Sequence, residues 1–286
     1  MKARVKKILN KVYKNIMRPE MKILPGQISF FMVLSIIPLA ALIVALASEF
    51  SLSITSFINS FLDNIPKEAA DIIKNVIQGE GLNFNMTVFY ISTLILASNG
   101  TYSMILASNT MYKFENKSYL RRRFKALVMT VILVLLILFI ILVPAFGDLI
   151  FKVIEYFVGQ TSVTEYAYKI YRVLKYPLSI VFIFISVKLL YTMAPDTRIK
   201  SKTTTRGSIF TTIFWILATD LYSFYIRHFT RYNLFYGSVA NIIVLLLWVY
   251  LLSYIFVLGM ALNETEHGEI ERTRELNLKE IKDTKK

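Results

Sequence analysis

The feature that most constrains this chain is an uncharged, strongly apolar run from Ile242 to Leu262. At about 1.5 Å of rise per residue, a helix of this length spans a hydrocarbon core of roughly 30 Å. We therefore predict a transmembrane helix over about residues 239–262. Its start is marked by Gly237, which ends the preceding loop, and by Ser238, whose side chain can cap the first turn of a helix.

The composition indicates that this run is one of several in a membrane protein. Of the 286 residues, 55% are hydrophobic and 18% are charged, whereas soluble domains usually carry about 25% charged residues. We predict an all-α, polytopic membrane protein with six transmembrane helices, joined in part by amphipathic helices at the membrane surface. The other five spans are expected at about residues 28–47, 86–107, 126–146, 177–193 and 208–226.

The segments outside the spans are expected to lie on or near the membrane surface. Residues 1–27 form a basic amphipathic segment, and residues 263–286 form a charged tail that is either helical or disordered. These segments flank a transmembrane domain over residues 28–262. The connection over residues 50–85 is expected to hold amphipathic helices, and the loop over residues 147–176 is amphipathic and rich in tyrosine, which suits the interface.

The distribution of positive charge predicts the orientation. With the first residue inside, the cytoplasmic segments hold 24 Lys and Arg and the outer segments hold 8. The positive-inside rule then places both termini in the cytoplasm. The net charge of +14 could suggest a nucleic-acid partner, but the basic residues sit in short loops and form no single folded patch, so we expect membrane lipids and no nucleic acid as partners.

Several motifs resemble one known family. They are Tyr232-x-x-x-Tyr236-Gly237-Ser238, the following run Ile242 to Tyr250, and Gly259-x-x-Leu262-Asn263, with further echoes in Leu34-Ser35-Ile36-Ile37-Pro38 and Tyr191-Thr192-Met193-Ala194-Pro195. These motifs resemble those of the YihY/BrkB family of bacterial inner-membrane proteins, long labelled ribonuclease BN. The resemblance implies a place in the bacterial cytoplasmic membrane. The chain departs from the family at Ala240-Asn241, where Gly-Gly is frequent, and at Ala261, where an acid is frequent.

Polar residues and prolines inside the predicted spans are candidates for a substrate path, because intramembrane polar groups often mark pathways. Ser92, Asn99 and Ser103 recur on one face of the second span. Pro38 should free a carbonyl in the first span, which Ser35 could satisfy. Helix-to-helix hydrogen bonds explain the same residues without a substrate. The full candidate set is Ser35, Pro38, Ser92, Asn99, Ser103, Lys188, Asp220, Tyr232, Tyr236, Gly237 and Asn241.

The sequence carries no motif for catalysis, a cofactor or a metal. It has no cysteine, and its two histidines, His228 and His267, are expected on opposite sides of the membrane. We therefore predict a non-enzymatic protein that transports or exports a small or lipid-like substrate. The alternative is a scaffold or envelope-integrity protein that transports nothing. A membrane-bound, tRNA-processing ribonuclease is less favoured, because RNA cleavage needs an acid cluster in a cleft.

Overall fold

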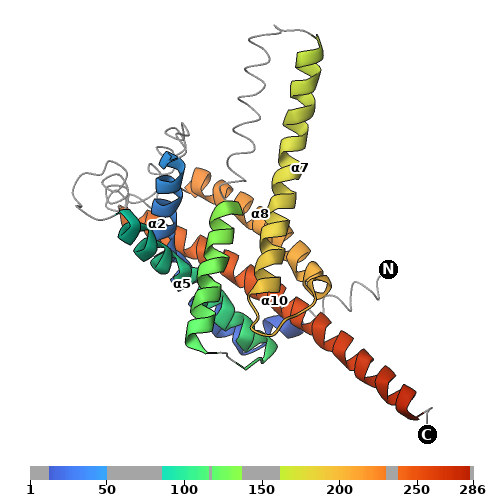
Figure 1. Cartoon of the computed structure of the whole chain (residues 1–286). Helices are drawn as coiled ribbons and strands as arrows, with labels where there is room; N and C mark the ends of the chain where they lie inside the picture. Colours follow the sequence, from blue (N-terminus) through green and yellow to red (C-terminus); the bar gives the residue numbers. More distant parts are fainter. Residues whose placement is uncertain (1–12, 50–85, 116–117, 137–161, 230–237, 284–286) are drawn as a thin grey trace.

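The computed structural model describes residues 13–49, 86–115, 118–136, 162–229 and 238–283. Within these ranges every regular element is a helix and there is no strand, which confirms the all-α prediction. The elements are α2 (Glu20–Glu49), α5 (Met86–Tyr112), a helix over residues 119–136 that carries no label in Figure 1, α7 (Ser162–Met193), a 3-10 turn η1 (Ser201–Thr204), α8 (Thr205–Phe229) and α10 (Ser238–Asp283).

Five of the six expected spans lie entirely within these helices. The span over 126–146 is covered only as far as residue 136, and its remainder lies outside the described residues. Two described helical segments are long and apolar enough to cross a membrane, Glu20–Ala40 and Leu245–Gly268, and Pro177–Met193 is a shorter apolar segment. A full set of six spans therefore stays a prediction.

Two helices extend further than the sequence suggested. We expected a loop up to residue 176, but α7 is helical from Ser162 and contains Pro177 in its interior. A proline removes one backbone hydrogen bond, and a long helix can continue past it when its remaining bonds are intact. The charged tail is also helical, because α10 continues to Asp283. The segments 1–12 and 50–85, for which we expected amphipathic helices, lie outside the described residues.

The buried core lies where several helix ends meet, which we call the junction. There, α2, the 119–136 helix and α8 begin, α5 and α7 end, and α10 passes with residues 256–266. The core side chains include Met21, Leu24, Ile28, Met104, Ile105, Met111, Ala126, Met129, Val187, Tyr191, Phe256, Val257 and Met260. The predicted topology places all of these ends on the cytoplasmic side. The packing agrees with helices that alternate in direction, because such helices bring these ends to one side.

Among the labelled helices the most extensive contact is between α2 and α5, and α10 packs on both α2 and α8. Figure 1 shows α7 reaching beyond the other labelled helices at one end, while the last part of α10 projects away from them. Most of the polar groups described below lie at the junction.

Candidate functional site

Tyr191, in the last turn of α7, connects three helices at the junction. Its side chain is 1% exposed. The hydroxyl donates to the carbonyl oxygen of Phe256 in α10 at 2.7 Å and lies 2.6 Å from the hydroxyl of Thr211 in α8. The ring stacks on that of Phe256, with centroids 4.6 Å apart. The approach depends on Gly259, since a Cβ at this position would collide with the hydroxyls of Thr211 and Tyr191.

Asn263 joins α10 to the beginning of α8. Its Oδ1 accepts a hydrogen bond of 2.7 Å from the backbone N–H of Gly207, one of the first-turn donors that have no partner within their own helix. Gly207 and Gly259 lie at the crossing, and a Cβ on Gly207 would collide with the carbonyl of Gly259. Asn263 is fully buried, and its Nδ2 has no hydrogen-bond partner among the described residues. The α8–α10 crossing is therefore closed by glycines and one asparagine.

A cluster of polar side chains connects α5, the 119–136 helix and the segment after α7. Asn109 exchanges two hydrogen bonds of 2.8 Å with Asp196, one to the carboxylate and one from the backbone N–H. The Lys125 ammonium donates to the carbonyls of Ala194 at 2.9 Å and Pro195 at 2.6 Å, and lies 3.4 Å from Asp196 Oδ1. The Asp196 side chain is only 2% exposed. Lys125 thus places a positive charge at the carboxyl end of α7, where the helix dipole favours it.

Charged residues of α10 extend the junction outward. Arg18 donates to Glu264 Oε2 at 2.8 Å, and Arg206 Nε lies 3.4 Å from Glu266 Oε2. Tyr112, at the end of α5, lies nearby and is buried. Burial, together with the negative charges of Glu264 and Glu266, raises the pKa of the Tyr112 hydroxyl well above its usual value. The Tyr112 hydroxyl therefore keeps its proton to a higher pH than a free tyrosine does.

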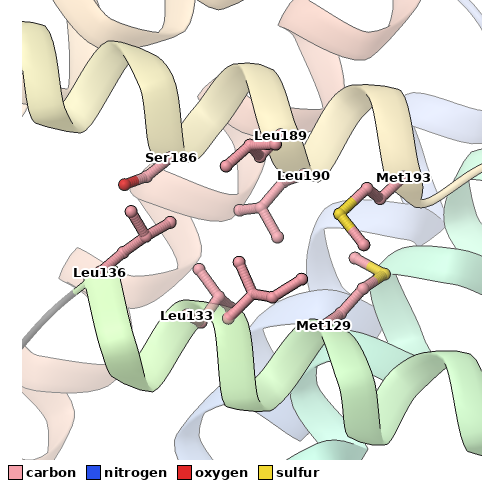
Figure 2. Close-up of a pocket in the computed structure, with 8 residues that line it drawn as sticks. Met129, Leu133, Leu136, Ser186, Leu189, Leu190 and Met193 are labelled. Atoms are coloured by element: carbon pink, nitrogen blue, oxygen red, sulfur yellow. The ribbon is translucent and has the colours of Figure 1, made fainter.

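An apolar crevice runs between the 119–136 helix and α7, next to the junction. Its enclosed volume is only about 10 Å³, and the wider space of about 190 Å³ is continuous with the surroundings. Figure 2 shows Met129 and Met193 at one end and Leu136 and Ser186 at the other. Ser186 contributes its polar group to its own helix, because its hydroxyl donates to the Phe182 carbonyl. The crevice therefore presents mainly methyl, methylene and thioether groups, a surface that suits an acyl chain.

Ser35 and Pro38, two of the residues predicted from the sequence, lie in α2. Ser35 is buried and accepts a 2.9 Å hydrogen bond from the N–H of Gly100 in α5. We expected its hydroxyl to satisfy the carbonyl of Leu34, which Pro38 leaves unpaired. That expectation is wrong, because the hydroxyl donates to the carbonyl of Phe31 at 2.7 Å, one turn earlier. Ser35 instead ties α2 to α5.

The three polar positions predicted on α5 differ in their surroundings. Ser92 is exposed, Asn99 is half-buried and Ser103 is buried. Both serines donate to carbonyls of their own helix, while Asn99 Oδ1 accepts a 2.9 Å bond from Arg123. Burial increases toward the end of α5 because that end reaches the junction. The helix continues without a break through Asn99 and Gly100.

The remaining predicted residues are not brought together with these. Lys188 is half-buried, with its ammonium 5.8 Å from the centre of the Phe184 ring. Asp220 is exposed on α8. Asn241 lies in α10, but its side chain lies outside the described part of the structure. Tyr232, Tyr236 and Gly237 lie outside the described residues. A role for these residues in a substrate path stays a prediction.

Asn109, Lys125 and Asp196 are among the junction residues that the sequence analysis did not select. One signal was present: Asp196 directly follows Ala194-Pro195 and is the one acidic residue in the basic connection over residues 194–207. An isolated acid in such a connection could have suggested a buried ion pair. Among the described residues, no group of three or more His, Asp or Glu is placed to hold a metal ion. Chemically, the junction is a buried hydrogen-bond network that fixes helix ends.

Comparison with known proteins gives a family assignment. The family model described as Virulence factor BrkB matches residues 12–282. A relative from Bacillus subtilis (strain 168) is 27% identical over 85% of this chain and 88% of its own length; it is called a ribonuclease-like protein, YfkH, in a name that marks this activity as unproven. A UPF0761 membrane protein of Pseudoalteromonas translucida (strain TAC 125) is 28% identical over 91% of this chain and 86% of its own length.

A second UPF0761 membrane protein, from Mannheimia succiniciproducens, is 24% identical over 90% of this chain and 89% of its own length. No solved structure matches this chain. The family match covers nearly the whole chain, including every motif on which the resemblance rested. This chain is therefore a membrane protein of the BrkB family.

Proposed function

We propose that this protein is a multi-pass protein of the bacterial cytoplasmic membrane that moves or exposes a lipid-like substrate. The convergence of helix ends at the junction supports six spans with both termini in the cytoplasm, because alternating helices must bring these ends to one side. Exposed basic residues surround the same end, at Arg121, Arg198, Lys200 and Lys202. Reporter fusions at both termini test the topology, and opposite locations for the two ends would contradict it.

The observation that carries the substrate proposal is the apolar crevice between α7 and the 119–136 helix. A polar solute would require hydrogen-bonding groups inside its site, because unpaired polar atoms are costly to bury. The crevice lining is almost wholly apolar. The exposed basic residues Arg121, Arg198, Lys200 and Lys202 lie at the same end of the bundle and place cations near the apolar surface. This combination favours an amphiphile over a small polar solute.

A flux assay tests the proposal. Purified protein reconstituted into vesicles should accelerate the movement of a fluorescently labelled phospholipid between the leaflets. Ser186→Phe should slow this movement, because the larger ring occupies the crevice. Ser92→Phe is the matched control, since Ser92 also donates to a carbonyl of its own helix but lies at an exposed position away from the crevice. Equal flux from both variants, or no flux from the native protein, would count against lipid movement.

A second candidate function, a scaffold, is supported by the last part of α10. Its charged segment beyond Gly268 projects away from the other labelled helices as a helix up to Asp283 (Figure 1). A projecting charged helix offers a surface for a partner protein. Copurification in a mild detergent should then recover a partner with the full chain and lose it when the chain is truncated after Gly268. An unchanged set of partners would contradict this role.

A further inference from the structure

Three consecutive arginines, Arg121 to Arg123, begin the 119–136 helix, and they differ in burial. Arg121 is exposed, whereas Arg122 and Arg123 are half-buried. The guanidinium carbons of Arg122 and Arg123 each lie 5.8 Å from the centre of the Tyr102 ring in α5. Tyr119 contacts the same ring edge-on, with centroids 6.0 Å apart. Two cations are thus held against one aromatic side chain, within the distance at which a guanidinium is attracted to an aromatic face.

The hydrogen-bonding groups of these arginines are incompletely used. Arg123 donates to Asn99 Oδ1 at 2.9 Å and to the Ile95 carbonyl at 2.8 Å. In the described part of the chain, Arg122 makes no hydrogen bond, and its Nε is buried without a partner. Neither arginine forms an ion pair with a carboxylate of the described residues. The ion pairs found there involve other basic residues, Arg18, Lys125 and Arg206. A guanidinium has five N–H donors, so Arg122 lacks the acceptors that a half-buried cation requires.

A phosphate supplies what is missing. Its oxygens accept parallel hydrogen bonds from the planar guanidinium fork, and its charge is balanced by two arginines. The start of a helix adds a further positive potential at this point. Both features favour an anion with several acceptor oxygens over a single carboxylate.

The position of the arginines indicates the source of that phosphate. They begin the 119–136 helix, at the end of the bundle that the predicted topology places at the cytoplasmic membrane surface, where lipid headgroups lie. The crevice does not reach them, because Ala126 and Ala194, which lie between, are fully buried.

We propose that Arg122 and Arg123, held against Tyr102, bind the phosphate of an anionic phospholipid headgroup at the cytoplasmic surface of the membrane. The inference rests on the proposed function for its choice of ligand and names the substrate class. It differs from a general attraction of positive loops to the membrane, which would depend equally on all three arginines.

The test measures binding of water-soluble dioctanoyl phosphatidylglycerol to the purified full-length protein in detergent by titration calorimetry. Arg122→Gln and Arg123→Gln should each weaken binding about tenfold, the loss expected for a charge-assisted hydrogen bond. Arg121→Gln is the matched control, with the same change of charge one residue away, and should stay within about twofold. Arg122→Lys keeps the charge without the planar fork and should recover only part of the affinity.

Two further ligands identify the source. Dioctanoyl phosphatidylcholine has the same chains and phosphate but no net charge, and should bind more weakly. Inorganic phosphate should bind far more weakly than the lipid, and equal affinity would overturn the lipid assignment. Equal losses from Arg121→Gln and Arg122→Gln would overturn the site. Unfolding temperatures measured without lipid show whether each variant is folded, and Arg122→Lys replaces Arg122→Gln if that variant is not.

Binding and flux separate this inference from the proposed function. A protein that binds phosphatidylglycerol through Arg122 but moves no lipid would overturn transport and leave the headgroup site in place. If Arg122→Gln moved lipid as fast as the native protein, the headgroup site would be overturned and transport would stand.

Discussion

The two halves of α8 differ in the side chains that they bury. In the half that begins at the junction, Gly207, Ser208, Thr211 and Thr212 are buried. Large apolar side chains face outward in both halves, with Ile209 and Ile213 47% and 51% exposed in the first and Leu221 and Phe224 63% and 55% exposed in the second. A soluble protein would reverse this arrangement, because exposed apolar area is unfavourable in water. In lipid the arrangement is favourable, since small polar residues allow close helix contact and apolar ones meet acyl chains.

The hydroxyl groups of the first half also explain how its polar atoms can be buried. Ser208 and Thr212 donate to carbonyls one turn earlier in the same helix, while Thr211 bonds with Tyr191. The second half is linked to its neighbours mainly by aromatic contacts, such as the stacking of Tyr222 on Trp248 at 5.2 Å. The difference teaches that specific geometry is concentrated at the junction, whereas the far half is held by less directional packing.

The largest test of this contrast is Gly259→Ala. An added methyl collides with Thr211 and Tyr191, so α8 and α10 must separate and the hydroxyl bonds of Tyr191 are lost. We expect a loss of about 3 kcal/mol or more in the free energy of unfolding in detergent. Gly268→Ala, in the same helix with nothing within 4 Å, should instead stabilise by up to about 1 kcal/mol. Similar results for the two variants would show that the crossing is not tightly packed.

The second test is Asn109→Ala. Asn109 is fully buried and makes two hydrogen bonds with Asp196, whose carboxylate would then rely on fewer partners. We expect a loss of roughly 2 to 3 kcal/mol, the range for buried hydrogen bonds to a charged group. Thr219→Ala in the far half of α8 removes only an exposed hydroxyl bonded within its own helix and should change stability by less than about 0.5 kcal/mol. Comparable losses would remove the distinction between the two regions.

The sequence predicted the helical class and the position of most helices, because apolar runs of bilayer length are a local signal. It indicated the family through short motifs, which are local too. It failed where the outcome depends on neighbours. Helix α7 starts at Ser162 although its early turns are polar and Pro177 follows, since a membrane helix can extend into the interface and continue past a proline. The tail could not be assigned between helix and disorder, and the structure continues α10 to Asp283.

Pairings across the junction were inaccessible for a different reason. Asn109 and Asp196 are 87 residues apart, and the sequence alone gives no register between α5 and the segment after α7. The motif around Gly259 and Asn263 was recognised as a family motif. Its structural role, closing the α8–α10 crossing, depends on Gly207, which lies on another helix. Polar spacing on α5 did not predict that burial would increase from Ser92 to Ser103.

The third test compares two tyrosines. Tyr191→Phe leaves the Phe256 carbonyl and the Thr211 hydroxyl without their buried partner, and should cost roughly 1.5 kcal/mol of unfolding free energy. Tyr222→Phe in the far half keeps the stacking ring and should change stability by less than about 0.5 kcal/mol. Chemical unfolding curves in the same detergent give both values. If Tyr222→Phe cost as much as Tyr191→Phe, the far half of α8 would also be held by directional bonds.

The smallest test uses pH to probe the junction at Tyr112. Burial and the charges of Glu264 and Glu266 raise the pKa of this hydroxyl above its ordinary value of 10.0. A raised pKa means that the folded protein keeps the proton longer than the unfolded chain, so its stabilising contribution is complete below pH 10 and decreases as pH rises further. Between pH 9 and pH 11, the native protein should lose about 1 kcal/mol more stability than Tyr112→Phe, which cannot ionise. The difference between the two unfolding free energies at each pH cancels the titration of the other tyrosines. An equal loss in both proteins would mean that Tyr112 ionises as freely in the folded protein as in the unfolded chain, and that the junction is open to solvent at this point.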